Sequence, residues 1–98
     1  MSVTELRWRA VPREDLAWRS WNGDFVFRNQ CTGSTHLLGP LAGEVLLLLS
    51  ARDHPATIDD LAAALTASAG VPAVDCAGAI EEMLPEFERL GLALPDER

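Results

Sequence analysis

The sequence predicts a small α+β domain in which short antiparallel strands come first and three helices follow. In the first third of the chain, apolar and polar residues alternate between glycine-containing turns, which is typical of half-buried strands. In the rest, apolar residues recur at helical spacing between capping and helix-breaking residues. The chain has 98 residues, of which 48% are hydrophobic. This size suits one domain with one core, which we assign to residues 1–98.

The strands are expected at residues 6–10, 25–28 and 35–38. In the first, arginine alternates with apolar residues that include Trp8, which we therefore place in the core. The two phenylalanines of the second strand share one of its faces. Asn22-Gly23 and Thr32-Gly33 supply the glycine that tight turns need. Leu16–Trp21 reads either as a turn or as a further short extended piece, and both interpretations stay open.

The helices are expected from Pro40 to about Asp53, from Thr57 to Gly70 and from about Val74 to Leu90. Thr57–Asp60 has the order of a capping box, with aspartate in place of the usual glutamate. Gly70 and Gly91 stand where helices end in a left-handed residue. Pro85 removes a backbone hydrogen bond from the third helix and is expected to kink it. The apolar stripe of the first helix is assigned to Leu41, Val45, Leu48 and Leu49. Leu46 and Leu47 widen it, so this helix is expected to be buried on most sides.

The order of these elements is typical of winged helix-turn-helix domains, whose second and third helices form the helix-turn-helix. After the last helix, Leu92 and Leu94 alternate with their neighbours and indicate a short closing strand. Trp18 and Trp21 either cover the sheet or form an exposed patch. We favour packing in the core or in a dimer for both.

The charge of the chain argues against nucleic acid as a partner. The net charge is −7, and all eight basic residues are arginine. The third helix, which would read DNA, carries Glu81, Glu82, Glu86 and Glu88 against Arg89 alone. No apolar run approaches the roughly 20 residues that span a bilayer, and the first residues lack the layout of a signal peptide. We therefore expect a cytoplasmic protein with no membrane partner.

Catalytic chemistry is not indicated by any motif. The sequence holds no nucleophile elbow and no glycine-rich phosphate loop. His36 and His54 lie in different segments, without a carboxylate or cysteine at the spacing of metal ligands. We expect no enzyme activity, no catalytic residue, no metal and no cofactor. Cys31 and Cys76 belong to no C-x-x-C pair and are expected as free thiols.

The stretch FVFRNQCTGSTHLLGPLAGEVLLLL, followed by TIDDLAAAL and then by LPEFERLGLAL, resembles the PqqD-like family of small winged-helix proteins. Members of that family recognise the leader peptides of ribosomally made, post-translationally modified peptides. The three tryptophans together with TGSTHLL resemble more specifically the HPr-rel-A type of PqqD-like peptide chaperone, which is found beside kinase-related proteins. The likeness covers nearly the whole chain, and the order of the motifs carries it.

The resemblance implies a peptide-binding site. The third strand would be a sheet edge beside the third helix, so that a leader peptide adds as one more strand. On the strand the site residues would be Ser34, Thr35, His36, Leu37 and Leu38. On the helix they would be Ala77, Ile80, Glu81, Leu84 and Glu88, whose two carboxylates would favour a basic leader. Core packing is nevertheless the interpretation that a helical apolar stripe favours for Ile80 and Leu84.

The function that follows is that of a non-catalytic chaperone. It would bind the leader of a precursor peptide and present it to a modifying enzyme, which the subgroup implies to be related to HPr kinase. Two alternatives stay open, a winged-helix DNA-binding regulator and a structural adaptor subunit of an enzyme complex. A homodimer formed by strand exchange at the exposed edge is a variant of the second.

Overall fold

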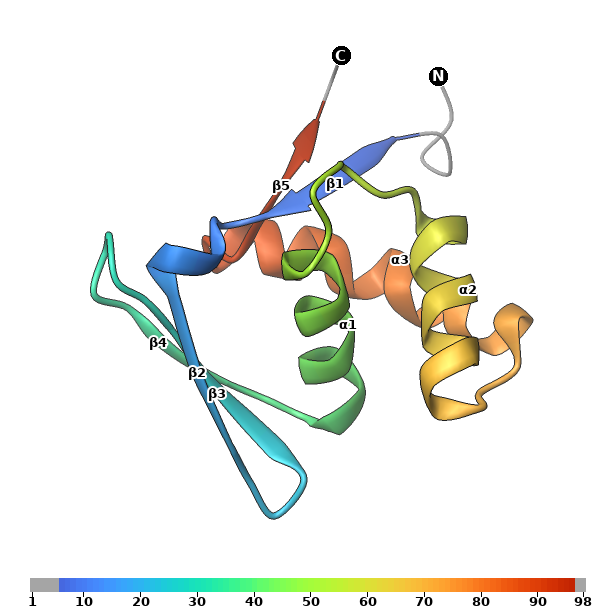
Figure 1. Ribbon diagram of the computed structural model, residues 1–98, viewed down its shortest axis with the longest axis horizontal. Coiled ribbons are helices and arrows are strands. Elements are labelled where there is room, and N and C mark those ends of the chain that lie inside the picture. The colour runs from blue at the N-terminus through green and yellow to red at the C-terminus, as the bar shows by residue number, and fades with distance from the viewer. Residues whose placement is uncertain (1–5, 97–98) are drawn as a thin grey trace.

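The structure is a computed structural model that describes residues 6–96 (Figure 1). Its elements are β1 (Arg7–Ala10), a short 3-10 helix η2 (Arg13–Asp15), β2 (Leu16–Trp21), β3 (Asp24–Asn29), β4 (Thr35–Leu38), α1 (Pro40–Ser50), α2 (Ile58–Ala69), α3 (Ala73–Arg89) and β5 (Ala93–Asp96). The α+β class and the order of antiparallel strands before three helices are confirmed. The segment that the sequence left undecided, Leu16–Trp21, is a strand, and the expected closing strand is β5.

The strands form two separate antiparallel sheets. One has three strands in the order β2-β3-β4, and the other pairs β1 with β5 from the two ends of the chain. In the larger sheet, β3 lies in the middle, so β2 and β4 are both edges. In the register, Phe27 of β3 lies opposite Trp18 of β2 on one side and opposite His36 of β4 on the other. These inner positions look toward the helices, and the alternate positions form the outer face of the sheet.

Helix α1 packs on the inner face of the larger sheet, and Gly43 is its point of closest contact with Phe25. This glycine is buried in the middle of the helix, and a β-carbon there would overlap the ring of Phe25. The absence of a side chain therefore lets the helix backbone approach the strand closely. Figure 1 shows α1 between the larger sheet and the pair formed by α2 and α3.

The predicted apolar stripe of α1 is confirmed in part. Val45 and Leu49 are buried as expected, and so is Leu46, which widens the stripe. Leu41 lies at the surface with 36% of its area exposed, and Leu48 is only half-buried. The run of four leucines carries no polar residue that would distinguish one face from another, so the contact at Gly43 decides which leucines face the core.

The predicted ends of α2 and α3 are confirmed. The hydroxyl of Thr57 accepts a hydrogen bond from the Asp60 amide, and the Asp60 carboxylate accepts one from the Thr57 amide, both at 3.1 Å. Aspartate thus completes a capping box at the start of α2. Gly70 and Gly91 have φ angles of 74° and 77°, the left-handed conformation expected of them.

The core lies between the three helices and the inner faces of both sheets. Trp8 belongs to it, with 4% of its area exposed, as the sequence predicted. Trp18 and Trp21 do not, since 51% and 72% of their area is exposed, and core packing is therefore wrong for both. Cys31 and Cys76 are free thiols, the first exposed and the second buried. No helix within residues 6–96 combines the length and apolar character that crossing a membrane requires.

Candidate functional site

Strand β4 is one of the two edges of the larger sheet, and the outward backbone groups of this edge are open to pairing. The Asn29 amide donates a hydrogen bond to the Ser34 carbonyl at 2.9 Å, which sets the phase of the ladder between β3 and β4. In an antiparallel pair, bonded and non-bonded residue pairs alternate. The backbone groups of His36 and Leu38 therefore point to β3, and those of Thr35 and Leu37 point away from the sheet. An added strand would bond to these last two residues.

The side chains of the predicted strand residues divide between the two faces of the sheet. Leu38 is buried, and His36 is half-buried on the same inner face. Leu37 and Thr35 are exposed on the outer face, and 71% of Leu37 is accessible. Ser34 precedes the strand and is half-buried. The face of each residue depends on register, which the sequence alone could not supply.

The polar side chains at the start of β4 are already engaged within the chain. The Ser34 hydroxyl lies 2.8 Å from Oγ1 of Thr32 and 3.2 Å from Nε2 of His36. The Ser34 amide also donates to Thr32 Oγ1 at 3.3 Å. These bonds stabilise the turn before β4. The side chains of Ser34 and His36 therefore act mainly in holding the conformation of the edge, and their polar groups are less available to a ligand.

On α3, the five predicted residues are placed at different depths. Ile80 and Leu84 are 0% and 1% exposed and belong to the core, which is the interpretation that the helical stripe favoured. Ala77 is half-buried, and Glu81 and Glu88 are exposed. The part of α3 that a ligand could contact therefore consists of Ala77 and the carboxylates of Glu81 and Glu88. Ile80 and Leu84 lie beneath this surface in the core.

The main packing partners of the two halves of the predicted site are different. In the described part of the chain, β4 packs on β3 and α1, whereas α3 packs on α2, α1 and β5. A hydrogen bond of 3.1 Å from Nδ2 of Asn29 to the carbonyl oxygen of Gly91 links the larger sheet to the end of α3. The buried amide of Asn29 and helix α1 thus both connect α3 to the larger sheet.

The exposed surface of α3 is strongly acidic. Glu81, Glu82, Glu86 and Glu88 are all exposed. Arg89 forms an ion pair with Glu86, and this hydrogen bond lowers the pKa of the Glu86 carboxyl and raises that of the guanidinium. The single cation of the helix is thereby neutralised, and its surface would repel a phosphate backbone. The geometry disfavours DNA recognition by α3.

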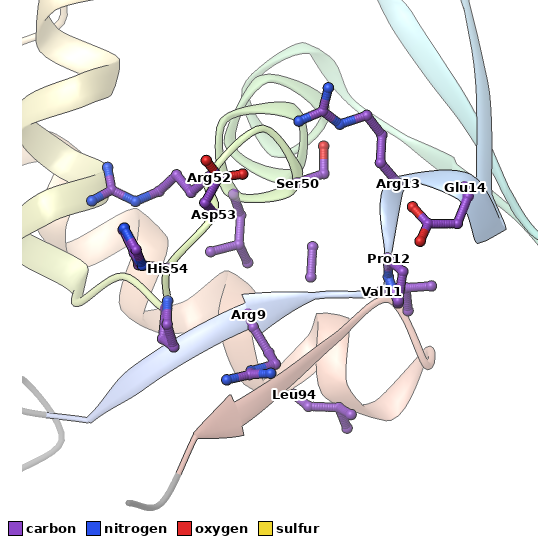
Figure 2. A pocket seen from close by; sticks show the side chains of 13 residues that line it. Arg9, Val11, Pro12, Arg13, Glu14, Ser50, Arg52, Asp53, His54 and Leu94 are labelled. Atoms are coloured by element: carbon purple, nitrogen blue, oxygen red, sulfur yellow. The ribbon is translucent and has the colours of Figure 1, made fainter.

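A hollow that the sequence did not indicate lies away from this edge. It has a volume of about 810 Å³ and lies between β1 and the segment that joins α1 to α2 (Figure 2). None of the ten predicted site residues lines it. Its arginines come from both sides of α1 in the sequence, so only the fold brings them together. Within residues 6–96, no group of three or more histidine, cysteine or carboxylate side chains is placed to hold a metal ion.

Two solved structures share the fold of this chain. One is "Lasso peptide synthetase B1 complexed with the leader peptide", with 22% sequence identity, a TM-score of 0.62, and a match over 90% of this chain and 98% of that one. The other is "TbiB1 in Complex with the TbiA(beta) Leader Peptide", with 13% identity, a TM-score of 0.62, and coverage of 84% and 92%. At these identities the likeness is one of fold. No protein-family model matches the chain, and no curated protein matches it.

Proposed function

We propose that this chain is a non-catalytic recognition domain that binds the leader of a ribosomally made precursor peptide and presents it to a modifying enzyme. The leader would add as a strand to β4, with its side chains directed toward the exposed flank of α3, which consists of Ala77, Glu81 and Glu88. The observation that carries the proposal is the free edge of β4, where Thr35 and Leu37 direct their backbone groups away from the sheet.

The properties of the edge suit a peptide ligand. The strand contains no proline, lysine or other charged residue, and these are the features by which proteins protect an edge from pairing. Backbone bonds to Thr35 and Leu37 would supply affinity that depends little on the leader sequence. Both structural neighbours were solved with leader peptides bound, which supports this class of ligand for the shared fold.

Selectivity would come from α3. Ala77 is small and leaves room for an apolar side chain of the leader, while Glu81 and Glu88 would attract basic residues. One apolar anchor buried there would contribute about 1.5–3 kcal/mol before the cost of ordering the peptide is subtracted. Ile80 and Leu84 would act from the core by holding this flank in place.

The class of the partner enzyme is a narrower part of the proposal. The neighbours support an assignment to leader-peptide recognition, and one of them is named as a lasso peptide synthetase B1. The more specific likeness to the HPr-rel-A type of PqqD-like chaperone rests on the sequence motifs. A partner related to HPr kinase therefore stays a prediction from that likeness, as does a location in the cytoplasm.

An amide NMR titration with leader peptides encoded beside this gene tests the proposal. Binding by strand addition should shift the amides of residues 34–38 and of the flank from Ala77 to Glu88. Leu37→Pro removes one outward N–H and leaves the bonds to β3 in place, so it should abolish the shifts. Leu37→Ala removes only the side chain and is the matched control, which should retain most of the affinity.

The outcome that would contradict strand addition is equally specific. If Leu37→Pro folds, as judged by circular dichroism, and still binds the leader with unchanged affinity, the peptide does not pair with β4. Shifts confined to other elements would lead to the same conclusion and would locate the true site. No shift with any of the encoded leaders would favour the adaptor alternative over a peptide chaperone.

A further inference from the structure

The hollow beside β1 has the architecture of a second ligand site. One wall is the chain from Arg9 to Glu14, and the other is the segment from the end of α1 through Pro55 (Figure 2). Leu49 and Leu94 contribute apolar surface, and 54% of the area of Leu94 is exposed. The hollow shares no residue with the proposed leader site on β4 and α3.

The backbone of β1 opens into this hollow. Trp8 and Ala56 exchange two hydrogen bonds, from the Trp8 amide at 2.7 Å and from the Ala56 amide at 2.8 Å. On its other side, β1 pairs with β5, where the Val11 amide donates to the Leu92 carbonyl. By the alternation of an antiparallel ladder, the backbone groups of Ala10 point the same way as those of Trp8. The chain opposite Ala10 has diverged, so these groups face the hollow.

The charge around the hollow is unusual for an acidic chain. Of the eight arginines of the chain, three line the hollow together with His54, namely Arg9, Arg13 and Arg52. Arg9 is held by Asp96 at 3.1 Å. Among the described residues, Arg13 and Arg52 form no ion pair, although Glu14 and Asp53 also line the hollow. Figure 2 shows Arg13 beside Ser50 on one side of the hollow, and Arg52 and His54 on the other.

We infer that this hollow binds an extended peptide segment that carries carboxylates. An open backbone position at Ala10 suits the main chain of such a segment, and the exposed Leu94 suits an apolar side chain. The guanidinium groups of Arg13 and Arg52, which form no ion pair within residues 6–96, suit carboxylates. Because leaders bound at β4 would meet the acidic surface of α3, the same chain would hold peptides of opposite charge at two places.

The test uses the full chain and a synthetic peptide as probe. The peptide is an acetylated and amidated valine–glutamate–valine–glutamate–valine, and its matched control has glutamine in place of both glutamates. We expect the acidic peptide to shift the amides of Ala10 and of residues 50–56 in an NMR titration, and the glutamine peptide to bind at least tenfold more weakly. Arg13→Gln and Arg52→Gln should each weaken binding by about tenfold.

Arg19→Gln is the matched control variant, because it removes the same charge from an exposed residue of β2 that does not line the hollow. It should leave the affinity unchanged. Equal losses in all three variants would mean that only net charge matters and would overturn the inference. Shifts with inorganic pyrophosphate but none with the peptide would overturn it in favour of a small-anion site. This titration follows the amide of Ala10, whereas the leader titration follows the amides of β4. If the acidic peptide caused no shift at Ala10, the proposed leader site would therefore be unaffected.

Discussion

The side chain of Asn29 donates a hydrogen bond to the carbonyl oxygen of Gly91 and accepts one from the amide of Cys31. Within residues 6–96, Asn29 is the buried polar residue of the core, at 5% exposed, and it joins the end of β3 to Gly91, two residues beyond the end of α3. Asn29→Ala should lower the free energy of unfolding by about 1–3 kcal/mol, because it leaves both partners unsatisfied. Urea denaturation measures the loss, and Gln30→Ala, at the exposed neighbour, should change it by less than about 0.5 kcal/mol.

Two helical glycines should respond oppositely to the same substitution. Gly43→Ala would drive a methyl group into Phe25 and should cost about 1–3 kcal/mol despite the better helix propensity of alanine. A β-carbon at Gly78 in α3 meets nothing within 4 Å, so Gly78→Ala should stabilise by about 0.5–1 kcal/mol. Thermal denaturation compares the two, and a stabilised Gly43→Ala would contradict the close approach of α1 to β3.

The two threonines of the α2 region should also differ in sign. Thr57→Ala removes the capping hydroxyl and should destabilise by about 1 kcal/mol. Oγ1 of Thr66 is buried without a hydrogen-bond partner in the described part of the chain. Thr66→Val should therefore leave stability unchanged or raise it by up to about 1 kcal/mol. If valine at this position were strongly destabilising, the hydroxyl would have to be satisfied in solution.

The exposed thiol should react slowly with alkylating agents near neutral pH. The Asp15 carboxylate accepts a hydrogen bond from the Cys31 thiol and repels the thiolate, and both effects raise the pKa of Cys31. Asp15→Asn removes the negative charge, lowers that pKa and should speed the reaction with iodoacetamide at pH 7, because the thiolate is the reactive form. Mass spectrometry locates the adduct. Cys76 is buried and should stay unmodified in the folded chain, and an unchanged rate at Cys31 would argue against the influence of Asp15.

The acidic flank of α3 should matter for basic leaders in a salt-dependent way. The double variant Glu81→Gln/Glu88→Gln should lower the affinity for a basic leader by no more than about fivefold per carboxylate, since both groups are exposed. The effect should shrink at high ionic strength. Calorimetric titration at two salt concentrations measures it, with Glu82→Gln as a control outside the predicted flank. Equal effects of all three glutamates would assign the attraction to net charge alone.

Local chemistry made much of the fold readable from the sequence. The capping box at Thr57, the left-handed glycines that follow α2 and α3, and the place of Trp8 in the core were all predicted and are confirmed. Each depends on residues within a few positions of one another, and their conformational preferences act regardless of the rest of the chain. The strand at Thr35–Leu38 was predicted for the same reason, whereas its place at a sheet edge was what the family resemblance implied.

Other features needed partners far away in the chain. Only the first residue of β2 is buried, so this strand has no apolar alternation and exists through its pairing with β3. In α1, the exposure of Leu41 and the partial burial of Leu48 were not predicted, because the leucine run is apolar all round and the contact of Gly43 with Phe25 fixes which leucines face the core. Ile80 and Leu84 are buried in the core, as the helical stripe favoured, whereas the resemblance had placed them at the peptide site. Helical spacing alone does not distinguish a core residue from one that lines a binding face.

By itself, the sequence determined the class of elements, their order, most of their ends and the acidic surface of α3, because these follow from neighbouring residues and from composition. Only the tertiary structure decided which backbone groups of β4 are free, how Asn29 connects the sheet to α3, and that Arg13 and Arg52 meet at one hollow. These depend on strand register and on contacts between residues tens of positions apart, which no local preference specifies.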